Sequence, residues 1–200
     1  ATGAKLAPAS TSEESASPGV SSLRAGQNVP PPVTEVPIPD ASLYPLLSAE
    51  FALRNRDFDY ALALLHEQAL LLTDPELTRR ALKLAEFRQR DDLALELAIH
   101  LTELDTEDGD AATTAMGLLI KAGRSQEAVG FAREAKERGA RISAPSLLVN
   151  FEGDSSEQRA LLAGSLEGLA QSYPDDNDIA IAVALVRREY DALDDSLEAL

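Results

Sequence analysis

Apolar residues recur along residues 40–200 at the spacing of amphipathic helices, and short polar breaks divide them into paired apolar runs. The small residues among them are regularly spaced, because Ala61, Ala94 and Ala128 stand 33 and 34 residues apart. The same spacing returns four residues further on, at Leu65, Ala98 and Ala132. A fixed period of this length with two helices in each unit predicts an all-α superhelical array of stacked helical hairpins.

The apolar runs predict three regular hairpins in the first part of this array. Their helices are expected at Tyr44–Arg54 and Tyr60–Leu72, at Leu77–Phe87 and Leu93–Leu104, and at Ala111–Ala122 and Gln126–Arg138. Helix starts are marked by Asp74, an N-cap residue before Pro75, and by Ser125. Gly123 is expected to form the turn of the third hairpin, and Gly139 to end its second helix.

The units after residue 140 are less regular. A short helix is expected near Ala144–Phe151, followed by a longer one at Ser156–Ser172. Asp154 is the predicted N-cap of that longer helix, and Glu157 three residues later would complete a capping box.

The last stretch predicts a fifth unit with a helix at Asp178–Tyr190 and a second helix begun at Asp194–Leu200. The sequence ends within that second helix, whereas a complete array closes with a helix that has a polar outer face. We therefore expect residues 40–200 to hold about four to five hairpins of a longer array.

Residues 1–39 differ in composition from everything after them. They contain no aromatic residue, and five of the ten residues from Pro30 to Pro39 are proline. Such a segment is expected to be a disordered tether with an extended, proline-rich end. An alternative interpretation makes that end a proline-motif ligand for another domain, although the nearest basic residue is Arg24.

Charge and composition exclude several classes of function. The net charge of −16 argues against binding nucleic acid through its phosphates, and against attachment to an anionic lipid surface. The chain has no cysteine, which removes disulfides, thiolate chemistry and most zinc sites. No apolar run reaches the roughly 18 to 20 residues that a membrane-spanning helix needs.

The residues that carry the period resemble the tetratricopeptide repeat (TPR) family over about 160 of the 200 positions. The best local match to the turn of that family is the segment from Gly123 to Ala128. The aromatic residue that opens each unit of the family is mostly missing, although Tyr44 lies close to it, and the closing proline of unit two is Thr106. The resemblance implies a helical array that binds other proteins and carries out no chemistry.

The tether together with the run from Leu43 to Glu50 resembles a narrower group, the periplasmic TPR lipoproteins of pseudomonads. Those proteins are anchored in the outer membrane, and one of them is an adaptor that presents cell-wall hydrolases to a carboxyl-terminal processing protease. The resemblance implies a periplasmic location and a lipidated cysteine just upstream of Ala1, through which alone the chain would meet a membrane. It also implies that the partners are such a protease and its peptidoglycan hydrolase substrates.

In the TPR family, the first helices of the hairpins line the groove that binds ligands. The resemblance places two sets of residues there: Leu46, Leu47, Glu50, Leu53 and Arg54 in unit one, and Arg79, Arg80, Lys83 and Glu86 in unit two. An apolar and basic groove of this kind could hold an amphipathic or acidic helix. The alternative is that the leucines belong to the core and the basic residues form a solvated face.

No catalytic, cofactor-binding or metal site is expected. His66 and His100 stand 34 residues apart on equivalent second helices, which lie too far apart for the two rings to share a metal. The segment from Gly164 to Gly168 superficially resembles a nucleophile turn but falls in the middle of a predicted helix. Basic residues recur at the ends of first helices and acidic residues at their starts, an order that fits helix dipoles better than a charged ligand site.

Three functions remain open from the sequence. The first is a non-catalytic adaptor that is tethered to the outer membrane and holds a protease together with its substrates. The second is the helical part of a cell-wall lytic enzyme, whose catalytic domain would follow Leu200. The third is a cytoplasmic TPR regulator, which a lipidation signal immediately before Ala1 would exclude.

Overall fold

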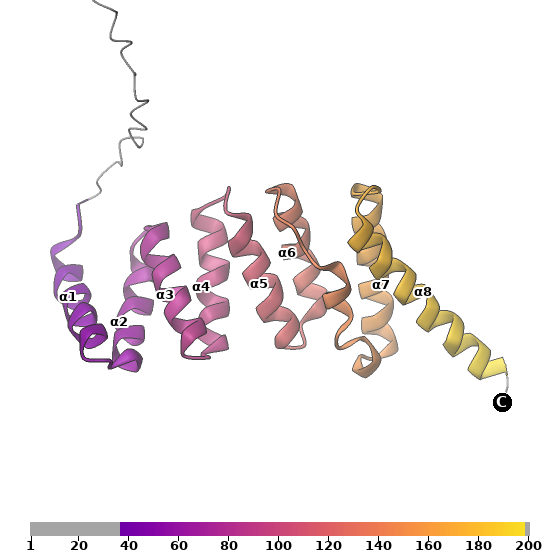
Figure 1. The fold of residues 1–200 in the computed structure, drawn as a ribbon, viewed down its shortest axis with the longest axis horizontal. Coiled ribbons are helices and arrows are strands. Elements are labelled where there is room, and N and C mark those ends of the chain that lie inside the picture. The colour runs from indigo at the N-terminus through magenta and orange to yellow at the C-terminus, as the bar shows by residue number, and fades with distance from the viewer. Residues whose placement is uncertain (1–36, 199–200) are drawn as a thin grey trace, which may run out of the picture. The chain divides into compact units, whose positions relative to one another are not determined.

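A computed structural model describes the backbone of residues 37–198 and the side chains of residues 37–190. Within that range the regular elements are helices, which confirms the predicted all-α array of hairpins (Figure 1). They are α1 (Asp40–Arg54), α2 (Phe58–Leu71), α3 (Pro75–Phe87), α4 (Asp91–Leu104), α5 (Gly109–Lys121), α6 (Ser125–Glu137), η1 (Ala144–Leu148), η2 (Phe151–Gly153), α7 (Ser156–Ser172) and α8 (Asn177–Glu198). The predicted tether lies outside the described residues except at 37–39, which precede α1 without regular structure.

The first three hairpins turn in the same way. Each turn contains one residue with a left-handed backbone: Arg56 with φ of 60°, Gln89 with φ of 55° and Gly123 with φ of 73°. In each case the next amide donates to a carbonyl five residues back, at 2.8–2.9 Å. Gly139, with φ of 77°, closes the second helix of the third hairpin as expected. These turns repeat every 33 or 34 residues, so they fix the register of the array.

The regularly spaced small residues are the contact points between helices. Ala61, Ala94 and Ala128 are each 0% exposed. Alanine at these positions allows two helix backbones to approach closely, because a larger side chain would hold them apart. Consecutive helices from α1 to α7 pack against one another in sequence order, as Figure 1 shows.

The buried apolar side chains form two clusters, and α5 contributes to both of them. Its Ala111 and Ala115 belong to the cluster built mainly from α1 to α4. Its Met116 and Leu119 belong to the cluster that continues through α6, α7 and α8. Phe131 of α6 packs against both clusters, so α5 and α6 join the two halves of the core.

The fourth unit departs from the predicted single short helix. The segment expected as a helix near Ala144–Phe151 is instead two 3₁₀ turns, η1 and η2, separated by Val149 and Asn150. Asn150 donates its side-chain amide to the carbonyl of Ile120 at 2.9 Å, which fastens this segment to the end of α5.

The prediction of two helices at the end of the chain is wrong within the described residues. The helix α8 runs without interruption from Asn177 to Glu198, through the expected break between Tyr190 and Asp194. Residues 190–198 contain neither glycine nor proline and are mostly residues that tolerate helix, so nothing in the local chemistry ends it.

The start of α7 also differs in detail from the prediction. Its N-cap is Ser155, whose hydroxyl accepts from the amide of Gln158 at 3.2 Å, while the Gln158 side chain accepts from the amide of Ser155 at 2.9 Å. The capping box is therefore formed by Ser155 and Gln158, one residue later than the predicted pair of Asp154 and Glu157. Both pairs of residues fit the sequence pattern of a capping box. The structure uses Ser155 and Gln158 because the helix begins at Ser156.

The loop between α4 and α5, residues 105–108, is held from two sides, and we call this arrangement the loop clamp. From α3, Arg79 places its Nη2 atom 2.8 Å from Oδ2 of Asp108 and 3.2 Å from Oδ2 of Asp105. From the end of α6, Arg138 donates to the main-chain carbonyls of Thr102, Asp105 and Asp108 at 3.0–3.2 Å. The clamp connects the second hairpin (α3 and α4) to the third (α5 and α6), and it places a cation at the carboxyl end of α4, where the helix dipole favours one.

Asp108 is also the N-cap of α5. Its Oδ1 atom accepts from the amides of Asp110 and Ala111, both at 3.0 Å. Burial alone would raise the pKa of Asp108, but the hydrogen bond from Arg79 and these two amides outweigh it and hold the pKa below its usual value.

Asp176 repeats this arrangement at the start of α8. The hydrogen bond from Lys136, whose Nζ lies 2.5 Å from Oδ2, is the main reason that the pKa of Asp176 is lowered. The amides of Asp178 and Ile179 donate to its Oδ1 and lower the pKa further. In both places a capping carboxylate also receives a cation from a helix earlier in the chain.

These two carboxylates predict a pH dependence of stability. Because their pKa values are lower in the folded chain than in the unfolded chain, their stabilisation is complete above about pH 5 and is lost as the pH falls through the folded values. We expect the melting temperature to fall between pH 5 and pH 3, and the Asp108→Asn/Asp176→Asn variant to show a smaller fall because asparagine still caps a helix without a charge. Circular dichroism melts at several pH values measure this slope.

The matched control for that experiment is Asp110→Asn/Asp175→Asn, which changes the same net charge at two exposed acids that form no ion pair within residues 37–190. An equal reduction of the slope in both double variants would contradict the assignment to the capped pairs.

Candidate protein-binding site

Two first helices present a continuous exposed surface, which we call the first-helix stripe and define as Leu47, Glu50, Arg80 and Lys83. Leu47 and Glu50 lie on one side of α1, and Arg80 and Lys83 occupy the equivalent positions 33 residues later on α3. The carboxylate of Glu50 pairs with the guanidinium of Arg80, which confirms that the two helices bring these positions together. Leu47 is 50% exposed, so the stripe combines an apolar residue with charged ones.

The charges in the stripe are fixed by their neighbours. The hydrogen bond from Arg80 lowers the pKa of Glu50 below its usual value, and Arg54 adds a smaller electrostatic contribution in the same direction. Glu50 therefore stays ionised at neutral pH and occupies part of the hydrogen-bonding capacity of Arg80. Lys83 is exposed and carries the other positive charge of the stripe.

The remaining residues of the predicted groove divide into three kinds. Leu46 and Leu53 are partly buried and pack against the first core cluster. The alternative interpretation, that Leu46 and Leu47 belong to the core, therefore holds in part for Leu46 but not for the exposed Leu47. Arg54 and Glu86 are exposed. Arg79 lies apart from the stripe, because its guanidinium is engaged by Glu76, Asp105 and Asp108 in the loop clamp. Whether the predicted groove residues bind a protein stays a prediction, and Arg79 is unsuited to test it because its replacement would disturb the fold.

The two histidines lie near different carboxylates, and only His66 is close enough to its carboxylate for a hydrogen bond. His66 lies 2.8 Å from a carboxylate oxygen of Glu96, and His100 lies 3.9 Å from one of Glu103. Within residues 37–190 no group of three or more histidine, aspartate and glutamate side chains is placed to hold a metal ion. Among the described helices, none is both long and apolar enough to cross a membrane.

Many charged side chains at the ends of helices cap a helix or pair with another helix of the array. Asp74 caps α3 by accepting from the amide of Glu76 at 2.9 Å. Between hairpins, the acid at the start of a second helix meets a base at the end of the next first helix: Asp59 with Arg88 at 2.9 Å, and Asp91 with Lys121 at 2.5 Å. These contacts support the interpretation that the charge pattern serves the helix ends and the contacts between units.

Sequence analysis missed a group of exposed aromatic side chains at the first hairpin. Tyr44 and Phe51 of α1 are 79% and 62% exposed, and Tyr60 of α2 is 52% exposed. Together with Ser48, Asn55 and others they line a hollow of about 410 Å³. These aromatic residues align with buried or partly buried residues of the next unit. The sequence could have revealed them, but only once the turns had fixed how the units align.

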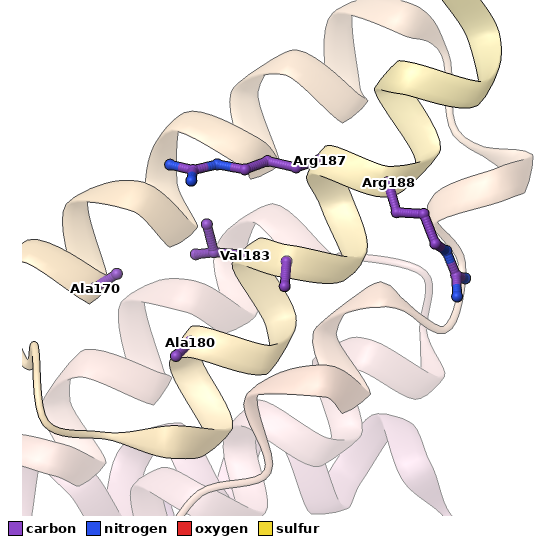
Figure 2. A pocket seen from close by; sticks show the side chains of 6 residues that line it. Ala170, Ala180, Val183, Arg187 and Arg188 are labelled. Carbon is purple, nitrogen blue, oxygen red and sulfur yellow. The ribbon is translucent and has the colours of Figure 1, made fainter.

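A second opening, of about 500 Å³, lies between α7 and α8 (Figure 2). Val183 and Arg187 project from α8 on the side of Ala170 of α7, while Arg188 projects from another side of the helix. The capping residues Asp108 and Asp176 stand 68 residues apart, so Arg187 and Arg188 of α8 align with Leu119 and Ile120 of α5. In α5 those positions are buried against the second core cluster. On α8 they carry arginine and remain exposed.

Hairpins with a period of 33 or 34 residues, joined by matching turns and packed through small residues, define a helical-repeat protein whose period is typical of tetratricopeptide repeats. Over 159 residues the chain is 28% identical to a TPR repeat-containing protein of Pseudomonas aeruginosa. That alignment covers 80% of this chain and 27% of the relative, so the chain spans about a quarter of the length of the protein it matches. No family model matches the chain. The hairpin array and this relative together support the TPR family.

Proteins of this class generally bind other proteins on surfaces built from several repeats. The first-helix stripe has the properties such a surface needs, because it spans two hairpins and offers apolar and charged groups side by side. The array therefore suits a protein-binding scaffold.

Proposed function

We propose that this chain is a non-catalytic scaffold that binds protein partners through the first-helix stripe. We further propose that it is part of a periplasmic adaptor, tethered to the outer membrane, that brings peptidoglycan hydrolases to a carboxyl-terminal processing protease. The observation that carries the first proposal is the exposed stripe of Leu47, Glu50, Arg80 and Lys83 across two hairpins. The resemblance to pseudomonad TPR lipoproteins supports the second, and the relative with 28% identity comes from a pseudomonad.

The stripe offers a partner a specific chemistry. Lys83 and the outer part of Arg80 can meet acidic side chains, while Leu47 can meet an apolar one. A helix with alternating acidic and apolar positions on one face would match both, which is a common mode of recognition. The strong net negative charge of the chain would repel an acidic partner from most of the surface. The two bases of the stripe therefore offer such a partner its most favourable electrostatic interaction.

The stripe predicts the effect of reversing its charges. The double variant Arg80→Glu/Lys83→Glu is expected to weaken capture of the partner by at least tenfold, because it places three carboxylates where two bases and one acid now lie alongside Leu47. Both residues are exposed, so helicity and melting temperature should change little. Binding is measured with a purified carboxyl-terminal processing protease, and separately by affinity capture from a periplasmic extract read by mass spectrometry.

The control is Arg133→Glu/Arg141→Glu, which makes the same change in net charge at exposed arginines of the third hairpin and the loop after it. If both double variants lose binding equally, net charge and not the stripe decides the interaction. Unchanged capture by the stripe variant would rule out the stripe, and absence of protease and hydrolases among the captured proteins would rule out the adaptor.

A further inference from the structure

The exposed aromatic residues of the first hairpin form a surface distinct from the first-helix stripe, which we call the end face and define as Tyr44, Ser48, Phe51 and Tyr60. Ser48 and Phe51 each lie one residue further along α1 than the stripe residues Leu47 and Glu50, which is a rotation of about 100° around the helix. These four residues line the hollow of about 410 Å³ together with Ala52, Asn55 and Asp57. Exposed apolar side chains are normally scattered singly over a protein surface. A cluster of three exposed aromatic side chains is instead typical of an interaction site.

The register of the array shows what covers these positions in other hairpins. One unit later, the equivalents of Tyr44, Ser48 and Phe51 are Leu77, Ala81 and Leu84 of α3. Ala81 is 0% exposed, and both leucines pack against the first core cluster, to which Leu62, Leu65 and Ala69 of α2 also belong. One unit further, Ala111 and Ala115 of α5 are 3% and 0% exposed beside α4. Ala111 and Ala115 belong to the first cluster, as α4 does, while Met116 and Leu119 of the same helix belong to the second. The second helix of the preceding hairpin therefore covers these positions in α5, and the register of the array places α2 over the equivalent positions of α3.

The ion pairs between hairpins point in the same direction. An acid in the first turn of α2, Asp59, pairs with Arg88 at the end of α3. An acid in the first turn of α4, Asp91, pairs with Lys121 at the end of α5. By the register of the turns, the residues of α1 that align with Arg88 and Lys121 are Asn55 and Arg54, and Arg54 is exposed. The end face therefore repeats the apolar half of an inter-hairpin contact and has one of its two basic positions beside it, at Arg54. Within the described residues 37–198, no helix supplies the other side of this contact.

From this we infer that the end face binds an amphipathic α-helix of another protein, in the place that the second helix of a preceding hairpin would take. The helix runs antiparallel to α1, as α2 does to α3 across their short link. It carries an acid in its first turn to meet Arg54 and a basic last turn to meet Asp40 at the start of α1. Its apolar face presents leucine and alanine to Tyr44 and Phe51.

Two other occupants fit less well. A second copy of the chain would bring another net charge of −16 to the contact, which opposes self-association at this surface. The ten residues directly before α1 include five prolines, a composition that disfavours the helix the end face requires. A helix from a different protein meets neither obstacle.

The test uses the whole chain and a synthetic probe. The probe is a 14-residue capped, fluorescein-labelled peptide with leucine and alanine at positions i, i+3, i+4 and i+7, aspartate in the first turn and lysine in the last. A control peptide has the same composition with the aspartate and lysine ends exchanged. We expect the probe to bind saturably, Tyr44→Ser/Phe51→Ser to weaken it at least tenfold, and Leu71→Ser/Leu161→Ser, at exposed leucines elsewhere, to leave it unchanged.

A charge exchange then tests the orientation. Arg54→Glu should weaken the probe about threefold and strengthen the exchanged peptide by a similar factor, the size expected of one exposed ion pair. Amide chemical shift changes on adding the probe should lie in α1 and α2. The inference is independent of the stripe, so Arg80→Glu/Lys83→Glu should still bind the probe even if that variant loses the protease.

Three results would overturn the inference. They are absence of saturable binding, equal affinity of the wild type and Tyr44→Ser/Phe51→Ser for the probe, and shift changes centred on the stripe. A dimer in sedimentation experiments that dissociates in the Tyr44→Ser/Phe51→Ser variant would also overturn it, because a second copy would then be the occupant.

Discussion

Replacement of Leu97 by alanine is expected to lower the free energy of unfolding by about 2–5 kcal/mol. Leu97 is 0% exposed, and it lies in α4 within the cluster that joins the first two hairpins to α5. Truncation removes its apolar contacts and leaves a cavity, because the flanking helices are held by alanine contacts that cannot close around a smaller side chain. Urea unfolding followed by circular dichroism measures the change.

The matched control is Leu71→Ala, at a leucine that is 66% exposed at the end of α2. Its effect should be within about 0.5 kcal/mol of zero, as for most surface substitutions. If the two leucine variants lose similar stability, the assignment of Leu97 to the core is wrong. The dependence of the unfolding free energy on urea concentration could also become less steep in Leu97→Ala. That result would indicate that the array no longer unfolds as one unit, since each repeat is stabilised by its nearest neighbours.

Replacement of Arg138 by alanine is expected to lower the free energy of unfolding by about 2–4 kcal/mol. The Arg138 side chain is 10% exposed, and its guanidinium donates to the carbonyls of Thr102, Asp105 and Asp108. Without it, three partly buried carbonyls lose their donor and the carboxyl end of α4 loses a favourable charge. The loop before α5 should then exchange its amide hydrogens faster, which hydrogen exchange followed by mass spectrometry can detect.

The conservative variant Arg138→Lys keeps the charge but cannot present two nitrogen atoms in a fork, so it should recover only part of the stability. The neighbouring Arg141→Ala removes one exposed arginine and should have little effect. Faster exchange in α1 and α2, with none in residues 102–109, would contradict the role given to the loop clamp.

The parts of the fold that the sequence predicted well are those that depend on neighbouring residues. Asp74 before Pro75 and the glycines at positions 123 and 139 act through the local backbone, and the structure confirms each of them. The regularly spaced alanines could also be recognised from the sequence, because every unit repeats the same contact between helices at the same position. The bounds of the helices in the first three hairpins follow from these signals to within a few residues.

The parts that were missed depend on residues far apart in the sequence. Arg79 looked like a groove residue because only its helix position was known, whereas its partners Asp105 and Asp108 lie 26 and 29 residues away. Nothing in the local sequence distinguishes Tyr44 and Phe51 from other residues of a helix. Their role became visible only when the positions of the turns aligned them with Leu77 and Leu84 of the next unit. The 3₁₀ turns of the fourth unit were missed because the hydrogen bond from Asn150 to Ile120 spans 30 residues.

The double role of α5 limits how such an array can change its length during evolution. Inserting one residue within α5 turns the rest of the helix by about 100°. That turn would take Met116 and Leu119 out of one cluster, and holding them in place would take Ala111 and Ala115 out of the other. A helix that is buried on one side only could shift sideways to absorb the insertion, but α5 has a neighbour on each side. Insertions and deletions within α5 are therefore expected to be tolerated worse than in a helix that is buried on one side only.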